Sequence, residues 1–477
     1  YHFASYIAPA AAQVFTKASA MSLYAGFQLP VGIFLTGVAA FCLASTLWGV
    51  WPAVAATVAV VVLPDAYQQG LANRYLSYNF IAQINLGMLY GIAAVALAWI
   101  FMIFGCRREK IGLVLLGYVF LLVCAFYKAH IFVANAFLIL MYPVVFYRSV
   151  QVKWRVVIGA VFIVVFVAAI WATQSHPRIP VMRLDGSGIS YYINKLVSDF
   201  DPGLLKEFFR PKVRTGGYKP VMAMYAAALL LLCTFGWWLL LAPIAFWKTR
   251  RLAPWATLLF PVIIVANYLV MGMGLALDDK QVGTVDELLN RPLVWAYFAV
   301  AAWAAGGLYY AIWRNRAPAT RWAGTAALAV VVVALVALSQ FSKDLQLFPS
   351  RTYVKFSAFN GVPVCMVKSA EFIKENSLPT DLVQESDNDL SFGFTALTER
   401  QLFAGSSTFG GLTPEHAERL EDLKHFLTLT QSDQIQSFAT ERKIGWYLLQ
   451  PSATAAWPAA FVEHAAFTCE GYKVFKF

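Results

Sequence analysis

Ten apolar runs, each close to the length that crosses a bilayer, dominate the sequence as far as Ser339. A membrane-spanning helix needs about 20 mostly apolar residues. Hydrophobic residues make up 60% of this chain and charged residues only 13%. The sequence therefore predicts a polytopic α-helical membrane protein. We expect spans near 30–48, 51–64, 84–104, 111–127, 131–147, 154–172, 221–247, 254–275, 293–313 and 321–339.

Basic residues are concentrated in every second loop between these runs. Four short loops carry twelve basic residues and one acid, Glu109, whereas the short loops between them carry few. Lys and Arg accumulate in cytoplasmic loops, so all four clusters indicate the same orientation. Residues 1–29, 65–83, 173–220 and 276–292 are then outer-face loops. The clusters are Arg107-Arg108-Lys110, Arg148-Lys153-Arg155, Lys248-Arg250-Arg251 and Arg314-Arg316-Arg321.

The composition changes after Ser339 to that of a soluble domain. From Gln340 onward 16 acidic residues outnumber 12 basic ones, although the whole chain has a net charge of +11. Helices and strands are expected to alternate in this part, which is typical of a small α/β domain. We therefore expect a transmembrane domain at 1–339 and an extracytoplasmic α/β domain at 340–477. The expected helices lie near 366–376, 414–428 and 431–442, and the expected strands near 381–385, 444–449 and 472–477.

The net positive charge and the spacing of the cysteines limit the ligands that this protein is expected to bind. Positive charge on so apolar a chain favours anionic lipid head groups or phosphates over nucleic acid, and no nucleic-acid motif is present. The six cysteines lack the spacing of a metal site. Cys365 and Cys469 in the tail can pair if the tail lies in an oxidising compartment, and the sequence leaves that pairing open.

Ionisable residues at the outer edge of the membrane are the functional candidates, because charge at membrane depth is costly. A carboxylate beside a histidine can act as a general base or hold a metal. Lys and Arg at the same level can hold a phosphate or pyrophosphate. The catalytic candidates are Asp65 and His2, and the substrate-binding candidates are Arg74, Tyr75, Lys128, His130 and Arg183.

Each candidate also has a structural interpretation. Asp65 follows Pro64 and can cap the start of a helix. His2 can be an interfacial histidine, and Lys128 can extend from the end of a span toward water. Arg74 is harder to explain in this way, because positive charge is sparse in the short outer loops. The hypothesis depends on the shared location of these residues at one side of the membrane.

Several short stretches carry a family resemblance: Tyr1-His2-Phe3-Ala4-Ser5-Tyr6, Pro64-Asp65, Tyr127-Lys128-Ala129-His130, Phe372-Ile373-Lys374-Glu375-Asn376, Pro379-Thr380-Asp381 and Leu397-Thr398-Glu399-Arg400. With the layout of the spans, they resemble the GT-C superfamily of membrane glycosyltransferases, in its bacterial form that uses polyprenyl-phosphate-linked sugars. The resemblance covers most of the chain and depends more on architecture than on motifs.

The resemblance implies inverting transfer of a sugar from a polyprenyl-phosphate donor, on the outer face, to a glycan, lipid or protein acceptor. A carboxylate would act as base, in some members with a divalent metal such as Mg²⁺ or Mn²⁺, and basic residues would hold the phosphate. It also implies a bacterial inner membrane with the C-terminal domain in the periplasm. The family's acidic pair would precede Tyr1, so we expect residues upstream, or a non-catalytic member. Asp65 is the nearest carboxylate that fits.

Two other functions compete with the enzyme. The chain can be a non-catalytic GT-C-like membrane subunit that binds partners in a larger complex. It can also be a transporter or flippase of lipid-linked sugars, but such proteins often contain inverted repeats and helices broken at mid-membrane. We find no convincing repeat, and Gly272 and Gly274 lie near a span end.

Overall fold

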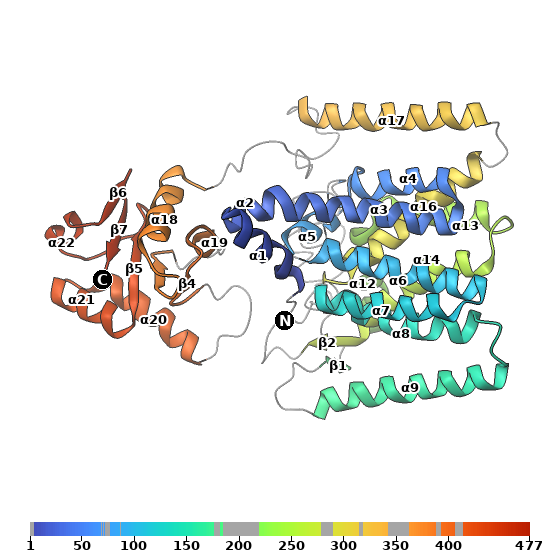
Figure 1. Ribbon diagram of the computed structural model, residues 1–477, viewed down its shortest axis with the longest axis horizontal. Helices are drawn as coiled ribbons and strands as arrows, with labels where there is room; N and C mark the ends of the chain where they lie inside the picture. The colour runs from blue at the N-terminus through green and yellow to red at the C-terminus, as the bar shows by residue number, and fades with distance from the viewer. Residues whose placement is uncertain are drawn as a thin grey trace. The chain divides into compact units, whose positions relative to one another are not determined.

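A computed structural model describes residues 4–67, 69, 71, 77–85, 87–175, 182–184, 219–277, 290–313, 318–341, 362–387, 393–405 and 414–477. The chain forms two compact units, a helical one and a C-terminal one that also includes residues 9–27. Figure 1 shows the order of the elements. The predicted candidates His2, Arg74 and Tyr75 and most of the predicted outer loops 173–220 and 276–292 lie outside the described residues.

Each of the ten predicted apolar runs is helical. The helical elements of the first part are α1 (Ala4–Thr16), α2 (Ala20–Leu23), the π-helix η1 (Tyr24–Gln28), α3 (Leu29–Trp48), α4 (Val50–Val61), α5 (Tyr78–Ile84), α6 (Met88–Arg108), α7 (Ile111–Tyr127), α8 (Ala129–Phe146), α9 (Val152–Ser175), α12 (Lys219–Phe235), α13 (Trp238–Thr249), α14 (Trp255–Gly274), α16 (Leu293–Trp313) and α17 (Pro318–Phe341). Two short strands, β1 (Met182–Leu184) and β2 (Leu275–Leu277), pair antiparallel.

Five helices in the described part of the chain are long and apolar enough to cross a membrane. They are Ala20–Trp48, Met88–Arg108, Ala129–Phe146, Trp255–Gly274 and Leu293–Trp313. A helix pair bent by 87°, Ala227–Phe235 with Trp238–Thr249, gives a sixth if it is one span. The composition and these helices support a multi-pass membrane protein, while the count of ten spans stays a prediction.

The structure differs from the sequence-based boundaries at two places on the predicted outer edge. α3 continues α2 and η1, so a single apolar helix begins at Ala20, inside the predicted loop 1–29. The predicted loop 65–83 contains most of α5, and the next long helix begins only at Met88. Gly87 separates these helices with φ +83°, a left-handed conformation that glycine adopts readily.

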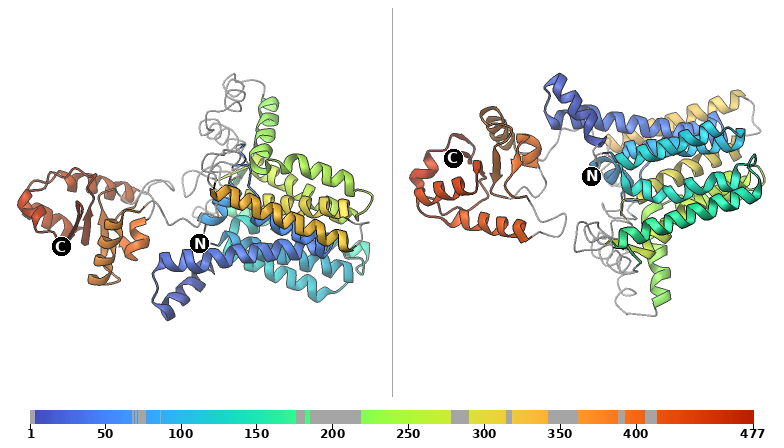
Figure 2. Two further views of the ribbon diagram at one scale, coloured as in Figure 1. Left: turned by 90° about the horizontal axis from the view of Figure 1, so that it is seen from above. Right: turned by 60° about the horizontal axis from the view of Figure 1, so that its bottom comes forward.

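The two most buried helices, α6 and α16, form the centre of the helical unit. The side chains of α16 from Leu293 to Ala304 are all buried, and α16 packs against α3, α4, α13 and α14. α6 packs against α3, α7 and α8. In contrast α9 exposes valines, isoleucines and two tryptophans along its length. Figure 2 shows the helices of this unit in two further views.

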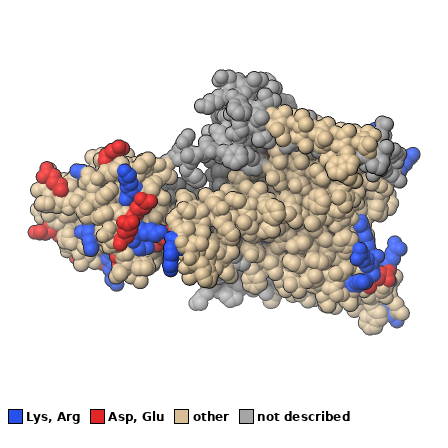
Figure 3. All heavy atoms as spheres, turned by 45° about the horizontal axis from the view of Figure 1, so that its top comes forward, with Lys and Arg blue, Asp and Glu red and all other residues tan. Residues whose placement is uncertain are grey.

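Basic side chains gather at one end of the helical unit (Figure 3). Arg107 and Arg108 occupy the last turn of α6, and Lys248 the last turn of α13. The turns that join α6 to α7, α8 to α9 and α13 to α14 all lie at this end (Figure 1). α5 and the turn between α7 and α8 lie at the opposite end, which is the end that the charge pattern predicts to be the outer face.

The C-terminal unit is built on a five-stranded mixed sheet with the order β4-β3-β5-β7-β6. β3 runs parallel to β4 and β5, and β7 runs antiparallel to β5 and β6. Its elements are α18 (Val364–Asn376), β3 (Leu382–Glu385), α19 (Gly393–Thr398), β4 (Gln401–Leu402), α20 (Pro414–Thr428), α21 (Ser432–Glu441), β5 (Ile444–Leu449), α22 (Ala459–Glu463), β6 (Phe467–Cys469) and β7 (Tyr472–Lys476).

Both faces of this sheet are covered. Side chains alternate along a strand, so Trp446 and Leu448 of β5 belong to one core, with Ile373 of α18, while Tyr447 belongs to another, with Phe426 of α20. The six predicted elements of the tail are confirmed, with ends that shift by no more than two residues. The helices α19 and α22 and the short strands β4 and β6 were not predicted from the sequence.

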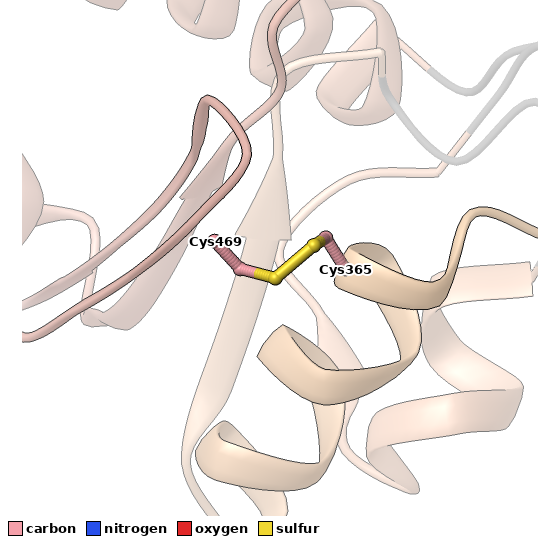
Figure 4. Close-up of a disulfide and its surroundings, with 2 residues drawn as sticks. All are labelled: Cys365 and Cys469. Carbon is pink, nitrogen blue, oxygen red and sulfur yellow. A yellow bond between two sulfur atoms is a disulfide. The ribbon is translucent and has the colours of Figure 1, made fainter.

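A disulfide between Cys365 and Cys469 joins the start of α18 to the end of β6 (Figure 4). The two Cα atoms are 5.4 Å apart, and the bond closes a loop with a sequence separation of 104 residues. Disulfides persist mainly in oxidising compartments. The bond is therefore consistent with the predicted extracytoplasmic position of this unit.

Candidate functional site

Asp65 anchors the start of α5 from outside that helix. Its carboxylate is fully buried, and Oδ2 accepts hydrogen bonds from Ser77 Oγ at 2.7 Å and from the backbone N of Asn79 at 2.9 Å. The first N–H groups of a helix lack partners within the helix, and negative charge is favourable near that terminus. The predicted cap is thus present, but Asp65 caps a helix 13 residues later in the chain.

The other end of α5 brings two cations together. Asn85, the residue after Ile84, accepts a hydrogen bond on Oδ1 from Arg291 Nη1 at 2.5 Å and a longer one from Lys128 Nζ at 3.4 Å. Asn85 Nδ2 donates to the carbonyl of Ile81 at 3.0 Å, which fixes the orientation of the amide. The acceptor that Lys128 and Arg291 share is therefore a neutral amide oxygen.

Lys128 is placed by the turn between α7 and α8. It has an extended backbone, and its N–H donates to the carbonyl of Cys124 at 2.7 Å. Gly91 of α6 packs on its side chain, since a Cβ added at Gly91 would lie 3.0 Å from Lys128 Cβ. The side chain is only 6% exposed, so its aliphatic stem is buried and its ammonium group reaches Asn85.

One short helix separates the carboxylate from the cations. Asp65 contacts residue Asn79 at the first turn, and the two cations contact Asn85, six residues later. At a rise of about 1.5 Å per residue, these points are about 9 Å apart along the helix axis. A small cleft lies along the same helix, lined by Tyr78, Asn79 and Gln83 and by residues of α3 and α4.

A hydrogen-bonded network holds α1 and the start of α3 beside Lys128. Ser5 Oγ donates to the carbonyl of Tyr127 at 3.1 Å, and Gln28 Nε2 donates to the carbonyl of Ser5 at 2.8 Å. Tyr90 Oη donates to the carbonyl of Gln28 at 2.9 Å, and the rings of Tyr90 and Tyr127 stack with centroids 5.6 Å apart. The stretch that begins at Tyr1 and the turn at Tyr127 are therefore in direct contact, at Ser5.

The structure describes three of the seven candidate residues fully. Asp65 and Lys128 lie at opposite ends of α5, and His130 lies in the first turn of α8, partly buried. Arg183 belongs to β1, where its backbone is opposite Ala276, but its side chain is outside the described part. His2, Arg74 and Tyr75 are outside it altogether.

Arg291 and Asn85 are functional candidates that the sequence did not single out. Arg291 is one of the few basic residues expected in the short outer loops, and this is the signal that could have found it. Asn85 carries no charge, so nothing in its local sequence distinguishes it. Within the described ranges, no three His, Cys, Asp or Glu side chains lie close enough together to hold a metal ion.

Chemically, the two cations fit an anion, and the carboxylate lies one short helix away from them. A phosphate oxygen could replace the amide oxygen of Asn85 as acceptor for Lys128 and Arg291, and a guanidinium can bind phosphate through two N–H groups. Asp65 places a buried carboxylate at the other end of α5, where Oδ2 accepts two hydrogen bonds.

No protein-family model and no curated protein sequence matches the chain. Several chains of solved structures resemble it, and three of them are described here. Archaeal oligosaccharyltransferase AglB from Archaeoglobus fulgidus, in complex with an inhibitory peptide and a dolichol-phosphate, is 11% identical with a TM-score of 0.42, over 93% of this chain and 60% of its own.

Two further structures are of the oligosaccharyltransferase from the same organism. The complex with Zn and sulfate is 11% identical with a TM-score of 0.43, over 93% of this chain and 58% of its own. The form tethered to an acceptor peptide containing the NVT sequon is 13% identical with a TM-score of 0.44, over 92% and 59%. The chain thus spans about three fifths of their length. A likeness of this size assigns neither a family nor an activity to the chain.

Proposed function

We propose that this protein is a membrane glycosyltransferase that binds the phosphate of a polyprenyl-phosphate-linked sugar at the outer ends of its helices. The observation that carries the proposal is the convergence of Lys128 and Arg291 on Asn85 Oδ1. Two cations that direct donors to one position at the predicted outer edge are suited to a phosphate group, whose several oxygens can accept charge-assisted hydrogen bonds from both.

The sugar would lie on the Asp65 side of the phosphate. In that position the carboxylate would accept the proton of the acceptor hydroxyl as the sugar is transferred. Lys128 and Arg291 would stabilise the negative charge that develops on the phosphate leaving group. The acceptor class, glycan, lipid or protein, and any divalent metal such as Mg²⁺ stay open. No step of this proposal uses a metal.

Binding of polyprenyl monophosphate to the full chain in lipid nanodiscs tests the phosphate site. We expect Lys128→Met and Arg291→Met each to weaken binding about tenfold or more, because a hydrogen bond to a charged group contributes about 1.5–3 kcal/mol. Arg108→Met is the matched control, because Arg108 lies at the opposite end of the helical unit with its guanidinium over the ring of Phe104. Wild-type affinity in both Lys128→Met and Arg291→Met would refute the site.

Asp65→Asn tests the catalytic role separately. The amide oxygen of Asn can accept the hydrogen bonds from Ser77 and Asn79, so we expect the fold and polyprenyl-phosphate binding to persist while sugar transfer is lost. Transfer would be measured with a polyprenyl-phosphate-linked sugar and a panel of acceptors. Full activity in this variant would remove Asp65 as the base.

A second candidate function is a non-catalytic GT-C-like subunit that binds lipid-linked donors or partners in a larger complex. It is favoured by the position of Asp65, which is fully buried and already caps α5. This candidate predicts polyprenyl-phosphate binding without transfer in the wild-type protein. It also predicts that Asp65→Ala lowers thermal stability, because the N–H of Asn79 and the hydroxyl of Ser77 lose their acceptor.

A further inference from the structure

A pocket lined by aromatic rings lies within the helical unit, where α3 turns into α4. Two of its rings, Trp48 and Trp51, belong to this turn, and the others belong to the last turns of α16. The space inside is about 190 Å³, whereas an engineered cavity of about 150 Å³ holds a benzene molecule. The pocket therefore has room for a small organic group. It is called the aromatic pocket below, and its five rings are Trp48, Trp51, Tyr309, Tyr310 and Trp313.

Arg107, in the last turn of α6, places the turn between α3 and α4 at the basic end of the helical unit. Its Nη1 donates to the carbonyl of Thr46 at 2.8 Å, and its Nη2 donates to Thr257 Oγ1, in the first turn of α14, at 3.2 Å. Tryptophan and tyrosine are enriched at both interfaces between membrane and water. The aromatic pocket is therefore expected at the depth of the lipid head groups, whichever end of the unit faces the cytoplasm.

Packing against neighbouring helices holds the rings in place. The indole of Trp48 lies on Gly306 and Gly307 of α16, where an added Cβ would approach it to 2.8 and 3.2 Å. From α17, the ring of Trp322 meets that of Trp51 edge-on, with centroids 4.7 Å apart. Because these contacts come from three helices of the same unit, the walls of the pocket are formed without a ligand.

The chemistry of these walls suits an ammonium group. The face of an aromatic ring attracts a cation within about 6 Å of its centre, and tryptophan does so most strongly. The pocket also includes Gly49, the residue after α3, and the last carbonyl groups of a helix have no partner within that helix. Such carbonyls can accept hydrogen bonds from a primary ammonium group. Among the described residues that line the pocket, none is charged.

We propose that the aromatic pocket binds the primary ammonium group of a phospholipid head group, as in phosphatidylethanolamine. The expected depth of the pocket favours a lipid over a soluble amine. The ammonium group would lie against the rings, and the phosphate of the same lipid would stay outside the pocket, near the basic side chains that gather at this end (Figure 3). A zwitterionic head group satisfies both surroundings, whereas phosphatidylglycerol has no ammonium group. This site does not depend on the phosphate site proposed above.

Native mass spectrometry of the full chain tests the proposal, with phosphatidylethanolamine and phosphatidylglycerol of the same acyl chains offered at equal concentrations. We expect the wild type to retain phosphatidylethanolamine in preference. Trp51→Leu and Trp313→Leu keep an apolar side chain but remove a ring, so each should lower this preference about fivefold, the fold-change of about 1 kcal/mol for one cation–π contact. Trp255→Leu is the matched control, because Trp255 is an exposed tryptophan at the start of α14, at the same end of the unit but outside the pocket.

Three outcomes would overturn the proposal. Equal retention of the two lipids by the wild type would mean that the ammonium group is not recognised. A preference that persists in both Trp51→Leu and Trp313→Leu would mean that the aromatic pocket is not its source. An equal loss of preference in Trp255→Leu would assign the effect to interfacial tryptophans in general.

A comparison that needs no variant protects the test against a substitution that prevents folding. Acetylation of the amine of phosphatidylethanolamine removes the positive charge and keeps the rest of the lipid. The wild type should retain the unmodified lipid about fivefold or more over the acetylated one, because the cation–π contacts require the charge. Equal retention of the two forms would overturn the proposal.

Discussion

Ser5 Oγ donates a hydrogen bond of 3.1 Å to the backbone oxygen of Tyr127, 122 residues later in the chain. The bond joins two stretches that the sequence suggests as functional, the one that begins at Tyr1 and the turn that carries Lys128. Ser5 is only 1% exposed, so the bond is shielded from water. The position of Lys128 therefore depends on residues at the N-terminal end of the described chain as well as on its own turn.

Gly87 leaves the space that this hydrogen bond needs. A Cβ at this position would lie 1.9 Å from Ser5 Oγ and 2.7 Å from the carbonyl oxygen of Tyr127, and the φ of +83° already disfavours a side chain. We expect Gly87→Ala to destabilise the protein by about 2–4 kcal/mol, through backbone strain and overpacking together. Thermal unfolding in detergent measures this change.

Gly112→Ala is the control for Gly87→Ala. Gly112 lies in α7, has nothing within 4 Å of an added Cβ and has no positive φ. Alanine is favoured over glycine in a helix by about 1 kcal/mol, so this variant should be as stable as the wild type or slightly more so. Equal melting temperatures for the two variants would mean that the Ser5–Tyr127 contact does not constrain Gly87.

The disulfide between Cys365 and Cys469 determines how many of the six cysteines should react with an alkylating reagent. When the protein is denatured without reductant, four cysteines should react with an alkylating reagent, since Cys42, Cys106, Cys124 and Cys233 are free. Replacing Cys365 and Cys469 by serine should lower the free energy of unfolding of the C-terminal unit by about 2–5 kcal/mol. Cys42→Ser, at a half-buried free thiol, is the control for this change in stability. Alkylation of all six cysteines without reductant would contradict the disulfide.

The orientation in the membrane can be tested with introduced cysteines. Gln151 lies exposed in the turn between α8 and α9, at the basic end of the helical unit, and Glu418 lies exposed on α20. The positive-inside rule predicts that a membrane-impermeant maleimide labels Glu418→Cys in intact cells and labels Gln151→Cys only after the membrane is opened. The reverse pattern would invert the orientation and move the phosphate site to the cytoplasmic side.

The sequence predicted elements well where one physical signal dominates. Pro414 at a helix start and the apolar run Ile444–Leu449 correctly predicted α20 and β5, because proline suits the first turn and a buried strand needs a continuous apolar run. β4 has two residues and β6 three, too few for a hydrophobic period to be visible. These strands form only because the sheet beside them supplies hydrogen-bond partners.

Only the charged residues of the candidate site could be predicted from the sequence. Asp65 and Lys128 stand out because charge next to an apolar run is costly. Asn85 is neutral, and its role follows from the folded chain, which brings Lys128 and Arg291 to its side-chain oxygen. That convergence joins residues 43 and 206 positions away from Asn85, and no local pattern reports it.

Asn85→Asp offers the sharpest test of this convergence. Asp has nearly the same shape as Asn but carries a negative charge, so it would form ion pairs with Lys128 and Arg291 in place of hydrogen bonds to a neutral amide. Asp also lacks the N–H that Asn85 donates to the carbonyl of Ile81, so we expect thermal stability to change little as the two ion pairs offset that loss. A bound phosphate would meet a competing anion, so polyprenyl-phosphate affinity should fall about tenfold or more, by a free energy of about 1.5–3 kcal/mol. Asn85→Gln, which keeps the amide but lengthens the side chain, should weaken binding less. Unchanged lipid affinity in Asn85→Asp would mean that the two cations do not bind the donor.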